Sequence, residues 1–101
     1  MTEARLEVVS PGHYRLTGEL DFDSVPALAA RSGELFRAPG DVRVSLAGVA
    51  RADSAGLALL VDWLREARRR GRHIGFSQVP EQLLALARVS GVDELLPLDP
   101  Q

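Results

Sequence analysis

Apolar and polar residues alternate in several stretches of this chain, and each such stretch predicts a β-strand. Alternation on both sides of the turn sequence Ser10-Pro11-Gly12, within residues 6–18, is typical of a β-hairpin. The same period of two returns in residues 42–46, where Gly48 is expected to end the strand, and in residues 73–77. The pattern therefore predicts four strands, of which the first two are joined by a tight turn.

Between and after these strands, apolar residues recur at helical spacing. A first helix is predicted to begin at Asp23 or Ser24, either of which can cap it, and to end near Arg37. A later helix is predicted over residues 80–90, because its proline fits the first helical position. A last apolar turn in residues 92–98 completes the chain.

The strongest helical signal follows the strand at residues 42–46. Asp53 and Ser54 are cap candidates, and three arginines in the last turn precede Gly71, which suits the left-handed residue that ends many helices. Cations are favourable near a helix C-terminus, so this arginine cluster is expected to be a solvated helix end. The apolar stripe expected to face the core consists of Leu57, Leu60, Val61, Leu64 and Ala67.

The predicted order of elements is β-β-α-β-α-β-α within 101 residues. Strands that are separated by helices of this length require crossover connections, so at least part of the sheet is expected to be parallel. The chain is therefore predicted to be a single α/β domain over residues 1–101, or α+β if the helices cover one face only.

Composition narrows the class of protein. The chain has no cysteine, which excludes disulfides, cysteine-ligated metals and thiol catalysis. Twelve basic and fourteen acidic residues give a net charge of −2, which argues against binding to nucleic acid by bulk electrostatics. No apolar run is long enough to span a membrane, and the first ten residues lack the apolar block of a signal peptide. A cytoplasmic location is expected.

A search for catalytic chemistry leaves no candidate. The phosphate-binding and dinucleotide-binding glycine motifs are absent, so no nucleotide cofactor is predicted. His13 and His73 lie in separate predicted strands without carboxylates at ligand spacing, so no metal site is predicted. Ser54 is not in the elbow of a hydrolase, and Asp21 with Asp23 is expected to form a turn and a helix cap. We therefore expect that the chain is not an enzyme.

One polar segment, residues 51–57, leads directly from a strand into the strongest helix. A hydroxyl at a helix N-terminus lies beside unpaired N–H donors, so a phosphate on Ser54 would be placed where the helix dipole favours negative charge. The simpler interpretation is that Ser54 or Asp53 only caps the helix, which contributes about 1 kcal/mol.

The residues Gly18-Glu19-Leu20-Asp21 after a strand, and Asp53-Ser54-Ala55-Gly56-Leu57 at the start of a helix, resemble the STAS domain of anti-sigma-factor antagonists over nearly the whole chain. Within that superfamily, residues 56–64 and 83–88 are most similar to MlaB-like subunits of Mla phospholipid-transport ABC complexes. The resemblance implies a small mixed β-sheet with about three to four helices packed on it, and a role in binding.

The resemblance leaves two functions open. An MlaB-like subunit docks on the MlaF-like ATPase subunit and, through it, meets the permease; it supports a transporter that maintains outer-membrane lipid asymmetry. Such a chain would be cytoplasmic and peripheral to the inner membrane. In an antagonist, by contrast, an anti-sigma kinase phosphorylates the serine at the position of Ser54, although Ala55 stands where many antagonists have a second Ser or Thr.

The predicted partner-binding surface consists of Asp21, Asp53, Ser54, Ala55, Gly56, Leu57 and Trp63. The small Ala55–Gly56 pair would let a partner backbone approach closely. Leu59 and Trp63 lie four residues apart, outside the stripe assigned to the core, and would extend an apolar surface; a half-buried place at the core edge is the alternative for Trp63. The turn at residues 78–81 would join the surface if it lies alongside.

Overall fold

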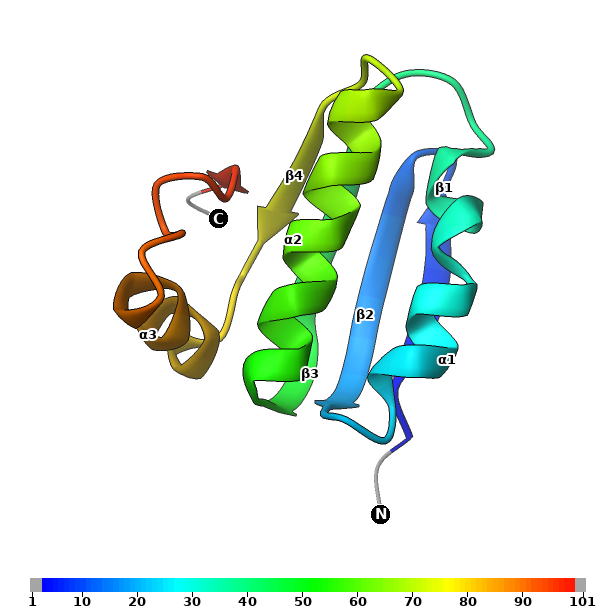
Figure 1. The fold of residues 1–101 in the computed structure, drawn as a ribbon. Helices are drawn as coiled ribbons and strands as arrows, with labels where there is room; N and C mark the ends of the chain where they lie inside the picture. The colour runs from blue at the N-terminus through cyan, green and yellow to red at the C-terminus, as the bar shows by residue number, and fades with distance from the viewer. Residues whose placement is uncertain (1–2, 100–101) are drawn as a thin grey trace.

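The computed structural model describes residues 3–99 and shows a single mixed sheet with α1 and α2 lying across it (Figure 1). The five strands follow one another across the sheet in sequence order. The elements are β1 (Arg5–Ser10), β2 (His13–Leu20), α1 (Val25–Ala30), the 3-10 helix η1 (Ser32–Phe36), β3 (Val42–Ala52), α2 (Ser54–Arg69), β4 (Ile74–Ser77), α3 (Glu81–Val89) and β5 (Leu98–Asp99).

The strand directions follow from the connections. The tight turn pairs β1 and β2 antiparallel, whereas β2 with β3, β3 with β4 and β4 with β5 are parallel pairs that are each joined through a helix. Two neighbouring strands can be parallel only if the connection brings the chain back to the end of the sheet at which the first strand began. A crossover helix does this. The predicted α/β class with a small mixed sheet is thereby confirmed.

Side chains of β2 show which face of the sheet is covered. Tyr14, Leu16 and Leu20 are buried, whereas Arg15 between them is exposed. Since successive side chains of a strand point to opposite faces, one face packs against the helices and the other is open and polar. The helices thus cover one face only, the case for which the α+β description was left open, while the parallel β-α-β connections are those of the α/β class. The core therefore lies between the sheet and the helices, with buried residues from α1, η1, α2 and α3.

The longest helix, α2, begins and ends as its sequence predicts. Asp53 is its N-cap residue, and Gly71 follows the C-cap with a positive φ of 69°. The backbone N–H of Arg72 donates to the carbonyl of Ala67 at 2.8 Å, which is the closing bond of a Schellman motif. Within residues 3–99, no helix has the length and apolar character needed to cross a membrane.

Two predicted boundaries are wrong. β3 does not end at Gly48 but continues to Ala52, because its register against β2 shifts twice and gives β3 two extra residues. These bulges change the spacing of buried residues from two to three, so the alternation that marks a strand disappears from the sequence. The first helix ends at Ala30 instead of near Arg37, since the poor helix formers Ser32 and Gly33 follow, and residues 32–36 form η1.

Candidate functional site

The carboxyl ends of β2 and β3 bring the two predicted segments together. Leu20 is paired with Ala52 in the parallel register, and the next residue on each strand is an aspartate, Asp21 and Asp53. The backbone N–H of Asp53 donates to the carbonyl of Leu20 at 3.0 Å. Both segments lie at the lower end of the sheet in Figure 1, where α1 and α2 also begin.

A small hollow of about 130 Å³ lies between these strand ends. The start of α3 closes one side of it, because the Gln82 side-chain oxygen accepts the backbone N–H of Ala52 at 3.1 Å. The turn at residues 78–81 thus leads into a helix that contacts the end of β3. The hollow is lined by Glu19, Leu20, Asp21, Arg51, Ala52, Asp53 and Gln82.

Asp53, and not Ser54, supplies the side-chain cap of α2. Its Oδ1 accepts the backbone N–H of Ala55 at 2.8 Å, which satisfies one of the unpaired donors at the helix start. Ser54 is the first residue of the helix and is exposed. The capping interpretation therefore applies to Asp53, and the hydroxyl of Ser54 lies on the surface beside the helix N-terminus.

Asp21 holds the turn between β2 and α1. Its Oδ1 accepts the backbone N–H groups of Asp23 and Ser24, each at 2.9 Å. The Ser24 hydroxyl accepts the N–H of Asp21 at 3.0 Å and donates to the Glu19 carbonyl at 2.6 Å. Ser24 is the residue before α1 but makes no side-chain cap to it, so the predicted cap is replaced by this network within the turn.

The backbone hydrogen bond from Ser24 lowers the pKa of Asp21 and outweighs the opposing effect of burial, and the Asp23 N–H, the Ser24 hydroxyl and the Arg51 charge lower it further. A carboxyl whose folded pKa is depressed stabilises the fold above its unfolded pKa of about 3.9, and this contribution disappears as the pH falls through the folded value. We therefore expect Asp21→Asn to destabilise the protein more at pH 7 than at pH 3. Urea unfolding at the two pH values measures this difference.

The matched control is Asp23→Asn, which removes an exposed charge from the same turn and leaves the acceptor oxygen of Asp21 in place. A destabilisation by Asp21→Asn that is equal at both pH values would contradict the assigned role of the Asp21 carboxylate.

Ala55, Gly56 and Leu57 are buried within the chain's own fold, and Gly56 lies against its sheet. A Cβ built on Gly56 would lie 2.9 Å from the Cβ of Leu20 and 3.4 Å from that of Ala52. The close approach that the small pair was expected to offer to a partner backbone is therefore used internally, where α2 crosses β2 and β3. Leu57 is 6% exposed and belongs to the core, as its place in the predicted stripe indicates, so the prediction that its side chain extends an exposed surface is wrong.

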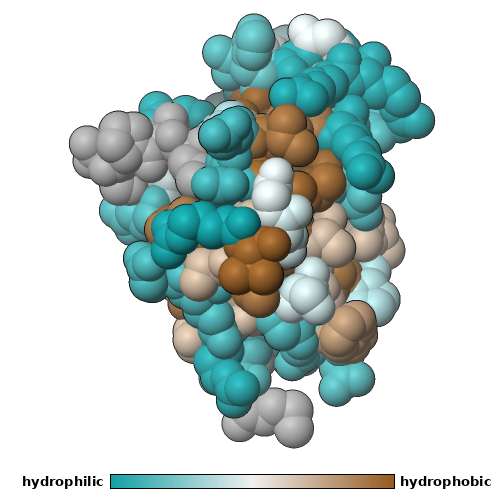
Figure 2. Space-filling model, turned by 60° about the vertical axis from the view of Figure 1, so that its left-hand side comes forward, coloured by the Kyte–Doolittle hydropathy of each residue, from teal (hydrophilic) through white to brown (hydrophobic). Residues whose placement is uncertain are grey.

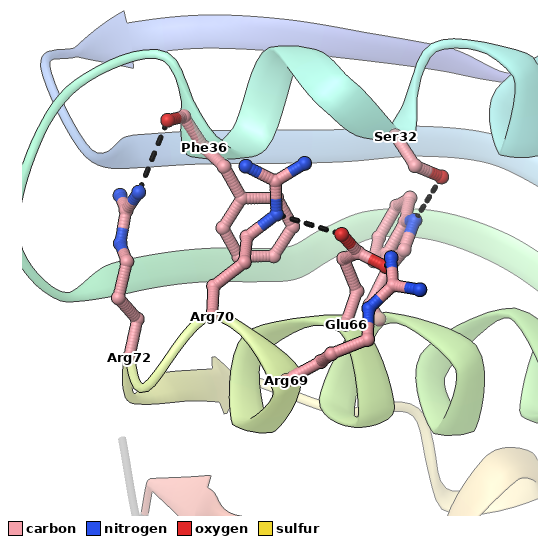
Figure 3. Close-up of polar contacts among 7 residues, drawn as sticks. Ser32, Phe36, Glu66, Arg69, Arg70 and Arg72 are labelled. Carbon is pink, nitrogen blue, oxygen red and sulfur yellow. Dashed lines mark hydrogen bonds and ion pairs between the residues drawn. The ribbon is translucent and has the colours of Figure 1, made fainter.

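The prediction that Leu59 and Trp63 extend an exposed apolar surface is also wrong. Each is 1% exposed. The Trp63 Nε1–H donates to the Ser32 hydroxyl of η1 at 2.6 Å, and the dashed line at Ser32 in Figure 3 marks this bond. The flank of α2 that the stripe facing the sheet leaves free is covered by α1 and η1, so these two side chains belong to the core.

Sequence reasoning missed two exposed residues beside the strand ends. Phe22, between Asp21 and Asp23, has 72% of its surface exposed. Ala58 lies one helical turn after Ser54 and is also exposed. The sequence carries a signal for each of them. Phe22 is an apolar residue inside a predicted turn, and Ala58 lies four residues after Ser54. We refer to the surface made of Asp21, Phe22, Asp53, Ser54 and Ala58 as the β2–β3 edge.

The arginine cluster lies at the opposite end of α2 (Figure 3). Arg69 and Arg70 both pair with Glu66, the Arg70 Nε being 2.7 Å from its carboxylate. The guanidinium of Arg70 lies 4.8 Å from the centre of the Phe36 ring, and Arg72 donates to the Phe36 carbonyl at 3.0 Å. The cluster thus ties the end of α2 to η1, in addition to being the predicted helix end.

Apolar surface occurs elsewhere too. On the side of the molecule that carries α3, Figure 2 shows hydrophobic side chains in the middle of the face and hydrophilic ones along its margins. Val89 at the end of α3 is 88% exposed. Val89 is therefore an exposed apolar residue outside the β2–β3 edge, and its substitution can serve as a control for substitutions in that edge.

Residues 7–97 match the family described as "Mlab, STAS domain". The chain belongs to the STAS domain family. The predicted resemblance is confirmed, and with it the STAS-like fold. Among residues 3–99, no three His, Asp or Glu side chains are grouped so that they could hold a metal ion.

Known proteins similar to this chain include anti-sigma factor antagonists and a chain of an Mla complex. The anti-sigma-B factor antagonist of Bacillus subtilis (strain 168) is 26% identical over 81 residues, which are 80% of this chain and 74% of that protein. The structure of an anti-sigma factor antagonist from Mycobacterium paratuberculosis superposes with a TM-score of 0.77 at 21% identity, covering 100% of this chain and 87% of the other. A chain of the Acinetobacter MlaFEDB complex in its ATP-bound Vtrans2 conformation gives a TM-score of 0.70 at 23% identity, covering 94% and 99%. STAS proteins such as these are generally regulators or subunits, not catalysts.

Proposed function

We propose that this STAS protein is a non-catalytic subunit that binds the ATPase subunit of an ABC transporter for phospholipid transport between the inner and outer membranes. In that role it supports the assembly and activity of a complex that maintains outer-membrane lipid asymmetry. The observation that carries the proposal is the match of residues 7–97 to the family described as "Mlab, STAS domain". The protein would lie in the cytoplasm, held at the inner membrane through the ATPase and the permease.

The β2–β3 edge is the surface proposed for docking. Asp21 and Asp53 are fixed by hydrogen bonds to backbone N–H groups, and Ser54 and Ala58 form an exposed strip on the first turns of α2. Groups that are already fixed lose little conformational entropy when a partner binds. Such an arrangement suits recognition of a protein surface, while ATP hydrolysis would remain in the partner.

We expect Ala58→Arg to weaken binding of the ATPase subunit by about tenfold or more, because a long charged side chain would have to be buried in the interface without a partner. Alanine and arginine are both strong helix formers, and Ala58 is exposed, so α2 should stay folded. Isothermal titration of the purified ATPase subunit with each variant measures the affinity.

The matched control is Ala85→Arg, which makes the same change at an exposed alanine of α3. Equal affinity of the Ala58→Arg variant and the wild type would remove the start of α2 from the proposed interface.

An anti-sigma-factor antagonist switched by phosphorylation of Ser54 is the second candidate. Ser54 is exposed directly after the N-cap residue Asp53, where a phosphate would meet the positive end of the α2 dipole. The Bacillus subtilis relative also has an antagonist role. This alternative requires a kinase partner whose affinity falls when Ser54→Asp adds a charge, and a phosphate on Ser54 in native cells.

A further inference from the structure

Phe22 is exposed on the β2–β3 edge, although burial of a phenylalanine side chain away from water is favourable. With 72% of its surface accessible, it is far more exposed than the aromatic residues of the core, Tyr14, Phe36, Trp63 and Phe76. Exposed aromatic side chains are enriched in protein–protein interfaces, where one of them often contributes a large part of the binding energy.

Hydrogen bonds hold the backbone of the turn before and after Phe22 in the sequence. Asp21 accepts the N–H groups of Asp23 and Ser24, and the Ser24 hydroxyl bridges back to Asp21 and Glu19. The backbone of Phe22 is therefore fixed before any partner arrives. A pre-organised aromatic residue pays less ordering entropy on binding than one in a mobile loop.

The turn itself carries only acidic charges, although Arg51 of β3 lies close enough to Asp21 to act on its carboxylate. Residues 19–24 contain Glu19, Asp21 and Asp23 and no basic residue. Residues 65–72, at the other end of α2, contain five arginines and one glutamate. Since the whole chain has a net charge of −2 and this segment has +4, the remainder has −6. The C-terminal end of α2 is therefore basic, whereas Asp21, Asp23 and Asp53 lie at the other end, near Phe22.

We propose that Phe22 is the aromatic anchor of the docking surface, and that it inserts into an apolar pocket of the ATPase subunit bordered by Lys or Arg side chains. The inference rests on the proposed function. Charge complementarity selects the basic border, because an acidic residue stands on each side of Phe22 in the turn, Asp21 before it and Asp23 after it. The arginine-rich end of α2 would then point away from the partner.

Titration of the purified ATPase subunit with the wild type and with Phe22→Ala tests the anchor. We expect the variant to raise Kd tenfold or more, with Phe22→Leu between the two. Val89→Ala, which truncates an exposed apolar residue on α3, should leave Kd within about twofold of the wild type. Because Phe22 is exposed, its variants should melt at the wild-type temperature.

A charge reversal at Asp23 tests the basic border of the pocket. Asp23→Lys reverses an exposed charge next to the ring and should also weaken binding, with the loss shrinking as the salt concentration is raised. Arg68→Glu, at the far end of α2, should have little effect.

The outcomes separate the two proposals. If the wild type binds the ATPase subunit and Phe22→Ala binds equally well, the anchor is refuted and the proposed function stands. A loss as large for Val89→Ala would refute it too, since the effect would not be specific to Phe22. If the wild type does not bind the ATPase subunit, the proposed function fails and the anchor fails with it.

Discussion

Replacing Trp63 with alanine is expected to lower the free energy of unfolding by about 4 kcal/mol, near the upper end of the range for large-to-small substitutions in a core. The indole is 1% exposed, so the variant would leave a cavity between α2 and η1. The half-buried Ser32 hydroxyl would also lose the hydrogen bond that it accepts from Nε1. A domain of this size is stable by about 5 to 15 kcal/mol, so much of its stability would be lost. Urea unfolding followed by circular dichroism measures the change.

Two milder substitutions separate the cost of the cavity from the cost of the lost hydrogen bond. Trp63→Phe keeps most of the apolar volume and should cost clearly less than alanine, and Ser32→Ala removes only the acceptor and should cost about 1 kcal/mol. If Trp63→Ala were as stable as the wild type and failed only in partner binding, Trp63 would be a surface contact, contrary to the structure.

The second large effect is expected for Gly56→Val, which should lower the free energy of unfolding by about 3 kcal/mol. A Cβ at this position would be 2.9 Å from the Cβ of Leu20, an atom next to the backbone that cannot move without shifting β2. The branched side chain of valine would push α2 away from the sheet along its first turn. The same urea titration measures the loss, which should exceed the small gain in helix propensity over glycine.

Gly33→Val is the control for this substitution. A Cβ on Gly33 has no atom within 4 Å, so the change should have a much smaller effect. Equal stability of the Gly56→Val variant and the wild type would mean that α2 does not approach β2 as closely as the structure shows.

Both results bear on how binding should be tested. Residues 55–57 and Trp63 lie in the predicted partner surface, but their side chains are packed inside the fold. A substitution there would weaken binding by unfolding the helix start, whatever the partner is. Exposed residues of the β2–β3 edge, such as Phe22, Ser54 and Ala58, test an interface without this ambiguity.

The sequence predicts correctly those helix faces that pack against one neighbouring layer only, the sheet. The stripe of α2 that faces the sheet follows from the helical period alone. The burial of Leu59 and Trp63 does not, because it depends on α1 and η1 lying across a second flank of the same helix. In the same way, β3 keeps its pairing to Ala52 through bulges that break the alternation by which a strand is detected.

The candidate site was predictable in position but not in detail. An aspartate after each of two strands places Asp21 and Asp53 at one edge once the strands are parallel, and the cap by Asp53 follows from its residue type. The exposure of Phe22 depends on the turn network of Asp21 and Ser24, which directs the chain so that the ring stays outside the core. Three-dimensional packing, and not the local pattern, separates Phe22 from the buried Trp63.

The most direct test of the proposed function is affinity capture of the tagged chain from detergent-solubilised native cells, with the wild type beside Ala58→Arg. Mass spectrometry identifies the captured proteins and the modification state of Ser54. We predict that the wild type brings down an ABC ATPase together with its permease, and that the variant loses both. Capture of a soluble anti-sigma kinase instead, with phosphate on Ser54, would contradict the transporter role in favour of the antagonist.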